Sequence, residues 1–181
     1  MSLKGSLKER DDHMSLKLSL VRVIYRVKGL FEDPLELFRE CGVKENEKIL
    51  EVGCAIGYHT LPLAELASSG KVYAVDVWEE GVEYLRRKAG VRNNIEILLT
   101  SAEKVNLDES SIDKVVCFDT LHEISDQKGA VGVWVRVLKR GGIVLYRDPV
   151  ISAKVVEDIS DGNLNYVGSV KGVDVLKLRE S

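Results

Sequence analysis

The stretch from Ile49 to Ala64 holds the residues most able to form a binding pocket. It reads ILEVGCAIGYHTLPLA, in which an apolar run ends at the acid Glu51 and is followed by Gly53 and Gly57. Because glycine has no Cβ, the backbone N–H groups of such a loop can approach a ligand closely at the start of a helix. The pattern predicts a strand that turns sharply into a helix and leaves a pocket at the turn.

The spacing of the glycines argues against a ligand with phosphates. A dinucleotide loop reads G-x-G-x-x-G, and counting from Gly53 its third glycine falls on the bulky Tyr58. The phosphate-binding pattern G-x-x-x-x-G-K-[ST] does not occur. The middle position is Ala55, where a methyl group costs little at negative φ and crowds a ligand at positive φ. The sequence leaves that sign open.

A second acid follows at the spacing that a nucleoside requires. Asp76 ends the apolar stretch KVYAVD, which begins at Lys71. A carboxylate about 20 residues after the first glycine, at the end of the next strand, can accept hydrogen bonds from both ribose hydroxyls. A helix N-cap is the alternative role for Asp76. The glycine loop and the acid together favour a nucleoside with little or no phosphate.

Strands and helices alternate around these residues. Apolar runs predict strands over Lys48–Val52, Val72–Asp76, Ile95–Thr100, Lys114–Phe118 and Ile143–Tyr146, with helices near Tyr58–Ala67, Glu79–Ala89 and Asp126–Leu138. Continuously apolar strands are typical of a parallel sheet covered on both faces, so an α/β, doubly wound fold is expected. The segments Leu164–Val170 and Val173–Leu178 flank Lys171-Gly172 and predict a C-terminal antiparallel hairpin.

The N-terminal part differs from this core. The letters MSLK occur at residues 1–4 and again at 14–17, and we expect residues 1–13 to be a disordered leader, native or added. Residues 14–181 are predicted to be a single domain, with a helical cap over 14–42. The cap contains an apolar helix, Leu16–Leu30, and a second helix that Asp33 caps and Pro34 starts. Leu16–Leu30 could close the pocket as a lid or bind a membrane surface.

Composition and charge are those of an ordinary globular protein. Of 181 residues, 45% are apolar and 30% charged, and no apolar run approaches the roughly 20 residues of a membrane span. We therefore expect a cytoplasmic protein without stable membrane insertion. The three cysteines lack C-x-x-C spacing and predict reduced thiols rather than a zinc site. A net charge of −3 gives no reason to expect nucleic-acid binding.

Five segments in fixed order resemble the class I S-adenosylmethionine-dependent methyltransferases, in particular their ubiquinone/menaquinone-methyltransferase-like branch (methyltransferase types 11 and 25). The segments are ILEVGCAIGYHTLPLA, KVYAVDVW, TSAEKVNL, IDKVVCFDTLHEI and VLKRGGIVLY. The resemblance runs from about residue 33 to the C-terminus. It implies a Rossmann-like, seven-stranded methyltransferase sheet, mostly parallel and ending in the antiparallel hairpin.

The resemblance also implies a site for S-adenosylmethionine. Its methionine end would lie along the glycine loop, its ribose on the second acid, and its adenine between the next two strand ends. The residues so implied are Glu51, Gly53, Cys54, Ala55, Gly57, Tyr58, His59, Asp76, Val77, Ser101, Ala102 and Phe118. The chain departs from the family pattern at Ala55 (usually Gly), at Ser101 (often Asp) and at Arg140 (often Pro).

The catalytic residues are less determined than the cofactor site. Methyl transfer needs an in-line acceptor held close, and it needs a base only when the acceptor arrives protonated. Asp119 and His122 are candidates, although packing at a helix start is the commoner role for such a histidine. Asp119 and Asp148 could together hold Mg²⁺, but a hard cation usually wants more ligands, so no metal site is predicted.

Two functions remain open at this point. The first is methyl transfer from S-adenosylmethionine, which leaves S-adenosylhomocysteine, to a small-molecule acceptor, with a homodimer as one possible assembly. The second is a catalytically silent protein that binds the cofactor for regulation or as a scaffold. An NAD-dependent oxidoreductase would need the glycine that Tyr58 replaces.

Overall fold

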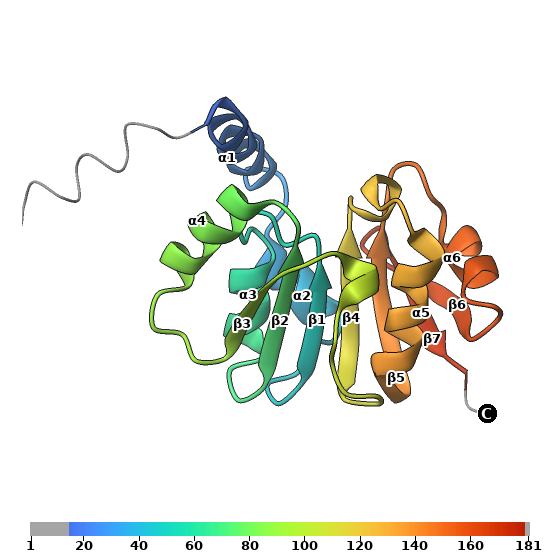
Figure 1. Ribbon diagram of the computed structural model, residues 1–181. Helices are drawn as coiled ribbons and strands as arrows, with labels where there is room; N and C mark the ends of the chain where they lie inside the picture. Colours follow the sequence, from blue (N-terminus) through green and yellow to red (C-terminus); the bar gives the residue numbers. More distant parts are fainter. Residues whose placement is uncertain (1–14, 180–181) are drawn as a thin grey trace, which may run out of the picture. The chain divides into compact units, whose positions relative to one another are not determined.

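The computed structural model describes residues 15–179, and these fall into two compact units (Figure 1). One unit ends at Glu32 and contains helix α1 (Leu16–Lys28), whose N-cap Ser15 accepts a hydrogen bond from the Leu18 N–H. The other begins at Asp33 and contains every other helix and strand. The predicted leader, residues 1–13, lies outside the described residues.

The unit from Asp33 onward is a seven-stranded sheet with helices on both faces (Figure 1). Its strand order is β3-β2-β1-β4-β5-β7-β6, with parallel pairing from β3 to β5 and antiparallel pairing of β7 with β5 and β6. The strands are β1 (Lys48–Val52), β2 (Lys71–Asp76), β3 (Ile95–Leu99), β4 (Ile112–Phe118), β5 (Leu138–Arg147), β6 (Leu164–Val170) and β7 (Val173–Leu178). The predicted doubly wound sheet with its terminal hairpin is confirmed.

The helices of this unit precede the first strand or lie in the connections between strands. They are α2 (Pro34–Glu40), α3 (Thr60–Leu66), α4 (Glu79–Ala89), α5 (Gln127–Val137) and α6 (Ala153–Ile159), with short 3₁₀ helices η1 (Ala102–Lys104) and η2 (Leu121–Glu123). Asp33 caps α2 by accepting from the N–H groups of Leu35 and Glu36, and Pro34 stands first in the helix, as the sequence predicts.

Two apolar clusters hold the helices on opposite faces of the sheet. Because neighbouring residues of a strand point to opposite sides, Ile49 packs with α2 and α3, whereas Leu50 packs with α5 and α6. Helix α4 places Val82 and Leu85 against Ala74 of β2. This alternation within each buried strand explains why β1, β2 and β4 are apolar throughout.

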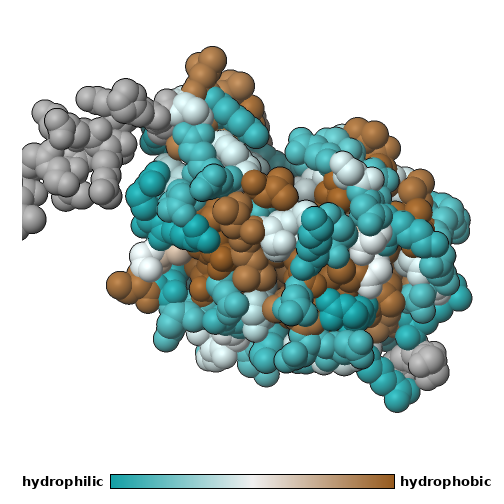
Figure 2. Space-filling model, viewed as in Figure 1, coloured by the Kyte–Doolittle hydropathy of each residue, from teal (hydrophilic) through white to brown (hydrophobic). Residues whose placement is uncertain are grey.

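The face that carries α5 is less completely covered over β2 and β3. The connection from β3 to β4 contains only the three-residue η1, so Tyr73 and Leu98 are partly buried rather than fully covered. Figure 2 views this face and shows apolar side chains gathered over these two strands, beside α4. Among residues 15–179, no helix is both long enough and apolar enough to cross a membrane.

Several element boundaries differ from the sequence prediction, and two of the differences have a clear cause. The fifth strand was expected at Ile143–Tyr146 but begins at Leu138, where it pairs with Ile112 before a register irregularity. Helix α3 begins at Thr60 rather than Tyr58, because residues up to His59 still belong to the turn that the glycine loop makes. Long-range pairing and loop geometry set both limits, and neither is visible in local periodicity.

Candidate functional site

The predicted site residues lie at the carboxyl ends of β1, β2, β3 and β4 or just after them. Strand β1 lies between β2 and β4. After β1 the chain adds β2 and β3 toward one edge of the sheet, and it then returns to add β4 and β5 on the other side of β1. Ligands of open α/β sheets bind at such a switch point, outside the carboxyl ends of the strands. The glycine loop that follows β1 is at this position.

Asp76 connects the first two strand ends. Its Oδ2 accepts a hydrogen bond of 2.7 Å from the Ala55 N–H, and its Oδ1 accepts one of 2.8 Å from the Trp78 N–H. One carboxylate thus holds the glycine loop and also the turn that leads into α4. A carboxylate offers about four lone-pair positions, so both oxygens can still accept hydrogen bonds from a ligand.

The backbone of the glycine loop is left-handed at three places. Gly53, Ala55 and Gly57 have φ values of 82°, 44° and 86°. Ala55 therefore adopts the positive φ that the sequence left undecided, a conformation that costs an L-residue about 1–2 kcal/mol. The hydrogen bond from its N–H to Asp76 is the contact that holds this strained residue in place.

Both glycines of the loop are closely approached by other side chains. A Cβ on Gly53 would lie 2.1 Å from the Thr120 Oγ1, and one on Gly57 would lie 2.3 Å from the Leu85 Cδ1. Gly53 lets the β4 end approach the loop, and Gly57 lets α4 do so. Thr120 is a site residue that the sequence analysis missed, because no local pattern indicates which side chain lies over a glycine.

Glu51 is a buried acid with an oxygen left unused. Its residue exposure is 2%, and its Oε2 has no hydrogen-bond partner within residues 15–179. Burial raises the pKa of Glu51 to about 8; the Thr60 hydroxyl opposes this rise and the Asp76 carboxylate adds to it. A buried polar atom without a partner is costly, so this oxygen suits a ligand group that donates a hydrogen bond.

His59 and Phe118 belong to an aromatic cluster rather than to an open pocket wall. His59 is 7% exposed, and its ring meets Phe38 and Phe118 edge-on at centroid distances of 5.7 and 5.2 Å. Phe38 and Phe118 stack on each other at 5.6 Å, and the Arg147 guanidinium lies 4.7 Å from the Phe118 centroid. The Tyr58 ring lies 4.9 Å from that of His59. This cluster fixes α2 and the start of α3 against the end of β4.

The residues predicted for the adenine end lie where the second and third strands finish. Val77 is 68% exposed directly after β2. Ser101 precedes η1, and Ala102 is buried within it, after the end of β3. Burial raises the pKa of Cys54 and also that of Cys117, so both thiols stay protonated.

His122 and Asp148 form a pair that spacing along the chain did not predict. The His122 Nδ1 lies 2.9 Å from the Asp148 Oδ2, and the Asp148 side chain is 0% exposed. Asp148 follows β5, whereas His122 lies in η2 just after β4, so the neighbouring strands bring them together. Asp119 is exposed and has φ of 53°, with its Oδ1 4.0 Å from the Arg147 Nε.

The structure does not bring Asp119 and Asp148 into a metal site. Within the part of the chain that the structure describes, no three His, Cys, Asp or Glu side chains come together as ligands. Asp148 is instead engaged with His122.

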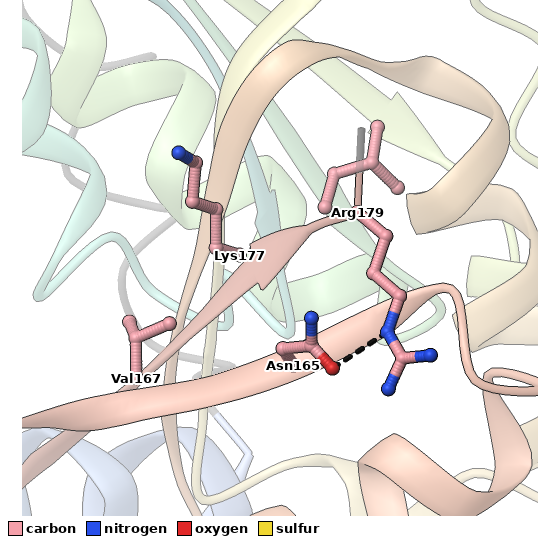
Figure 3. A pocket seen from close by; sticks show the side chains of 5 residues that line it. Asn165, Val167, Lys177 and Arg179 are labelled. Atoms are coloured by element: carbon pink, nitrogen blue, oxygen red, sulfur yellow. Dashed lines mark hydrogen bonds between the residues drawn. The ribbon is translucent and has the colours of Figure 1, made fainter. Parts of the chain in front are cut away.

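One further hollow lies far from the strand ends discussed so far. It has a volume of about 340 Å³ and is lined by Asn165, Val167, Lys177, Leu178 and Arg179 of the terminal hairpin (Figure 3). The Arg179 Nε donates to the Asn165 Oδ1 at 2.6 Å across it. Because β5 and β7 separate the hairpin's outer strand from β4, this hollow is not part of the candidate site.

Comparison with known proteins agrees with this geometry. Residues 50–146, just over half of the chain, match a family described as a methyltransferase domain. The chain is 29% identical over 110 residues to the aklanonic acid methyltransferase of a Streptomyces strain, covering 59% of this chain and 50% of that protein. It is 28% identical to a demethylmenaquinone methyltransferase of Staphylococcus aureus, covering 60% and 46%. The chain thus spans about half the length of these curated relatives.

Solved structures give the same result over more of the chain. A SAM-dependent methyltransferase from Aquifex aeolicus is 26% identical, with a TM-score of 0.70 over 84% of this chain and 96% of that one. Geranyl diphosphate methyltransferase in complex with SAM shares the fold, with a TM-score of 0.55 at 15% identity and 62% and 46% coverage. The matched family covers β1 through β5, the strands whose ends form the candidate site. The chain belongs to the methyltransferase-domain family.

Proposed function

We propose that this protein is an S-adenosylmethionine-dependent methyltransferase that acts on a small-molecule acceptor. The observation that carries the proposal is the Asp76 carboxylate, hydrogen-bonded to the glycine loop, together with the buried Glu51, whose Oε2 has no hydrogen-bond partner among residues 15–179. The family match and the SAM-dependent neighbour from Aquifex aeolicus support it. When bound, S-adenosylmethionine would supply a methyl group on a positively charged sulfur.

The residues present fit this cofactor. The unused Oε2 of Glu51 would accept a hydrogen bond from the ammonium group at the methionine end. Asp76 would accept from the two ribose hydroxyls with its remaining lone pairs. The exposed Val77 side chain would pack on one face of the adenine, beside Ser101 and Ala102. Each group thus meets a partner of matching chemistry.

The acceptor is proposed to be a small molecule, in the cytoplasm. The acceptors named for the two curated relatives, aklanonic acid and demethylmenaquinone, are small molecules of this kind. The connection between β5 and β6 holds only the seven-residue α6, which leaves little chain to recognise a folded macromolecule. An acceptor of quinone-like chemistry therefore suits the proposal.

Calorimetry with S-adenosylhomocysteine tests the cofactor part of the proposal. We expect binding at sub-millimolar ligand, and an Asp76→Ala change should weaken it by about 1.5–3 kcal/mol, the scale of hydrogen bonds to a charged group. Asp113→Ala is the matched control. Asp113 also accepts from a backbone N–H and a lysine, but it is the second residue of β4 and so lies at the end of that strand opposite the candidate site.

The control variant should bind S-adenosylhomocysteine like the original protein. Thermal unfolding of both variants would show whether a loss of binding comes from a loss of fold. No binding to the unaltered protein would contradict the proposal. Binding without methyl transfer to any acceptor in a screen with labelled donor would instead support the silent cofactor-binding protein.

A further inference from the structure

His122 and Asp148 are arranged as a hydrogen-bonded acid–imidazole pair. Asp148 Oδ2 lies 2.9 Å from the His122 Nδ1 and accepts from the His122 backbone N–H at 3.2 Å. Asp148 Oδ1 accepts from the N–H groups of Val150 and Ile151 at 2.9 and 3.0 Å. A carboxylate that receives four hydrogen bonds is fixed in place and remains ionised, so the Nδ1 facing it carries the hydrogen.

The second nitrogen of the His122 ring is left available. The His122 side chain is 27% exposed, and its Nε2 lies 3.9 Å from the Glu123 Oε1. That distance is too long for a hydrogen bond, and Glu123 is itself 77% exposed. With Nδ1 protonated, Nε2 carries the lone pair and can accept a proton.

The backbone fixes this ring close to the candidate cofactor site. Only Leu121, which is fully buried, separates His122 from Thr120, the residue whose side chain lies over Gly53. Both His122 and Asp148 follow the carboxyl ends of neighbouring parallel strands, β4 and β5. The pair therefore lies on the same edge of the sheet as the glycine loop.

We propose that His122 is the general base of the reaction, that Asp148 is its positioning residue, and that the acceptor is therefore a phenolic or enolic hydroxyl. This inference rests on the proposed methyltransferase function and gives its acceptor a chemical class. An acceptor that arrives without an acidic proton would need no such pair.

The step balances with the groups named. The hydroxyl proton passes to the His122 Nε2 while an oxygen lone pair forms the new O–C bond. The S–C bond of the methyl donor breaks, and its electron pair stays on sulfur, which leaves as a neutral thioether. The imidazolium then returns its proton to water.

The charges around the ring favour this role. The hydrogen bond to Asp148 raises the pKa of His122, with the negative charges of Asp148, Glu123 and Asp119 adding to the effect. Burial acts to raise the pKa of Asp148, but the hydrogen bonds from His122, Ile151 and Val150 hold it below its usual range. The cation Arg147 lies beside Asp119. A more basic imidazole is better matched to removing the proton of a phenol.

The experiment uses 4-nitrophenol, whose phenolate form absorbs visible light, with the full chain saturated with S-adenosylhomocysteine. We expect the protein to raise the phenolate fraction at neutral pH, because the imidazolium that forms pairs with the phenolate. His122→Gln should weaken phenolate binding by about tenfold or more, the effect of losing a charge-assisted hydrogen bond. Glu109→Gln removes an exposed carboxylate before the start of β4, at the end of that strand opposite His122, and should leave phenolate binding within about twofold.

The Asp148→Asn variant distinguishes a role of Asp148 in positioning the His122 ring from a role in stabilising the fold alone. NMR titration of the His122 ring should show its pKa falling toward the ordinary value in this variant, and the alkaline limb of phenolate binding, where the imidazolium loses its proton, should move to lower pH with it. Thermal unfolding would confirm that each variant is folded. An unchanged phenolate fraction with the unaltered protein, or equal binding by His122→Gln, would overturn the inference. Absence of S-adenosylhomocysteine binding in calorimetry would instead contradict the proposed function.

Discussion

At the scale of single residues, Ala55 is held in a conformation that glycine would adopt more easily. Its φ is 44°, and its N–H is tied to Asp76. An Ala55→Gly change should therefore raise the free energy of unfolding by about 0.5–1 kcal/mol, because relief of left-handed strain exceeds the added freedom of the unfolded chain. Urea unfolding would measure it. Ala64→Gly, in the regular helix α3, should change stability by about 1 kcal/mol in the opposite direction.

Glu51 makes stability depend on pH. Burial raises its pKa from 4.5 to about 8, so folding favours the protonated form. The contribution of protonated Glu51 to the free energy of unfolding is fully present below about pH 4.5 and is lost as pH rises through about 8. The free energy of unfolding falls by at most about 1.4 kcal/mol per pH unit over this range. Unfolding curves measured between these pH limits should thus show the free energy of unfolding of Glu51→Gln rising relative to that of the original protein as pH rises. The same series with Glu123→Gln, an exposed site, should show no such trend; a parallel trend would contradict the assignment.

At the scale of elements, the short helix α3 depends on a distant cap. The Asn94 Nδ2 donates to the carbonyls of Ala64 and Ala67, at 2.7 and 3.1 Å, at the C-terminal end of the helix, where the last carbonyls have no partner within the helix. Asn94→Ala should lower the free energy of unfolding by about 1–3 kcal/mol. The adjacent, exposed Asn93 offers a matched control, and Asn93→Ala should have little effect. Equal unfolding midpoints for the two variants would show that the cap is not needed.

At the scale of the whole molecule, the core belongs to the unit that begins at Asp33. Among residues 15–179, the three apolar clusters consist of residues from that unit, and α1 contributes none. A chain without residues 1–29 should therefore still unfold cooperatively in calorimetry. If the N-terminal helix is a lid, this chain should bind S-adenosylhomocysteine more weakly. If it binds membranes, cofactor affinity should stay unchanged and binding to anionic vesicles should be lost.

The sequence by itself determined the order of the elements and the kind of loop that follows the first strand. Apolar runs and the 3.6-residue helical period are local properties of the chain, so the predicted limits of β1, α4 and the terminal hairpin agree with the structure. Glycine and acid spacing likewise placed Gly53 and Asp76 at neighbouring strand ends.

Only the tertiary structure decided which polar groups meet and which backbone is strained. His122 and Asp148 are 26 positions apart, and Asn94 and Ala64 are 30 apart, so no local pattern relates them. Their pairing depends on strand order and on the path of each loop. The sign of φ at Ala55 depends in the same way on the hydrogen bond to Asp76, which forms only once β1 and β2 lie side by side.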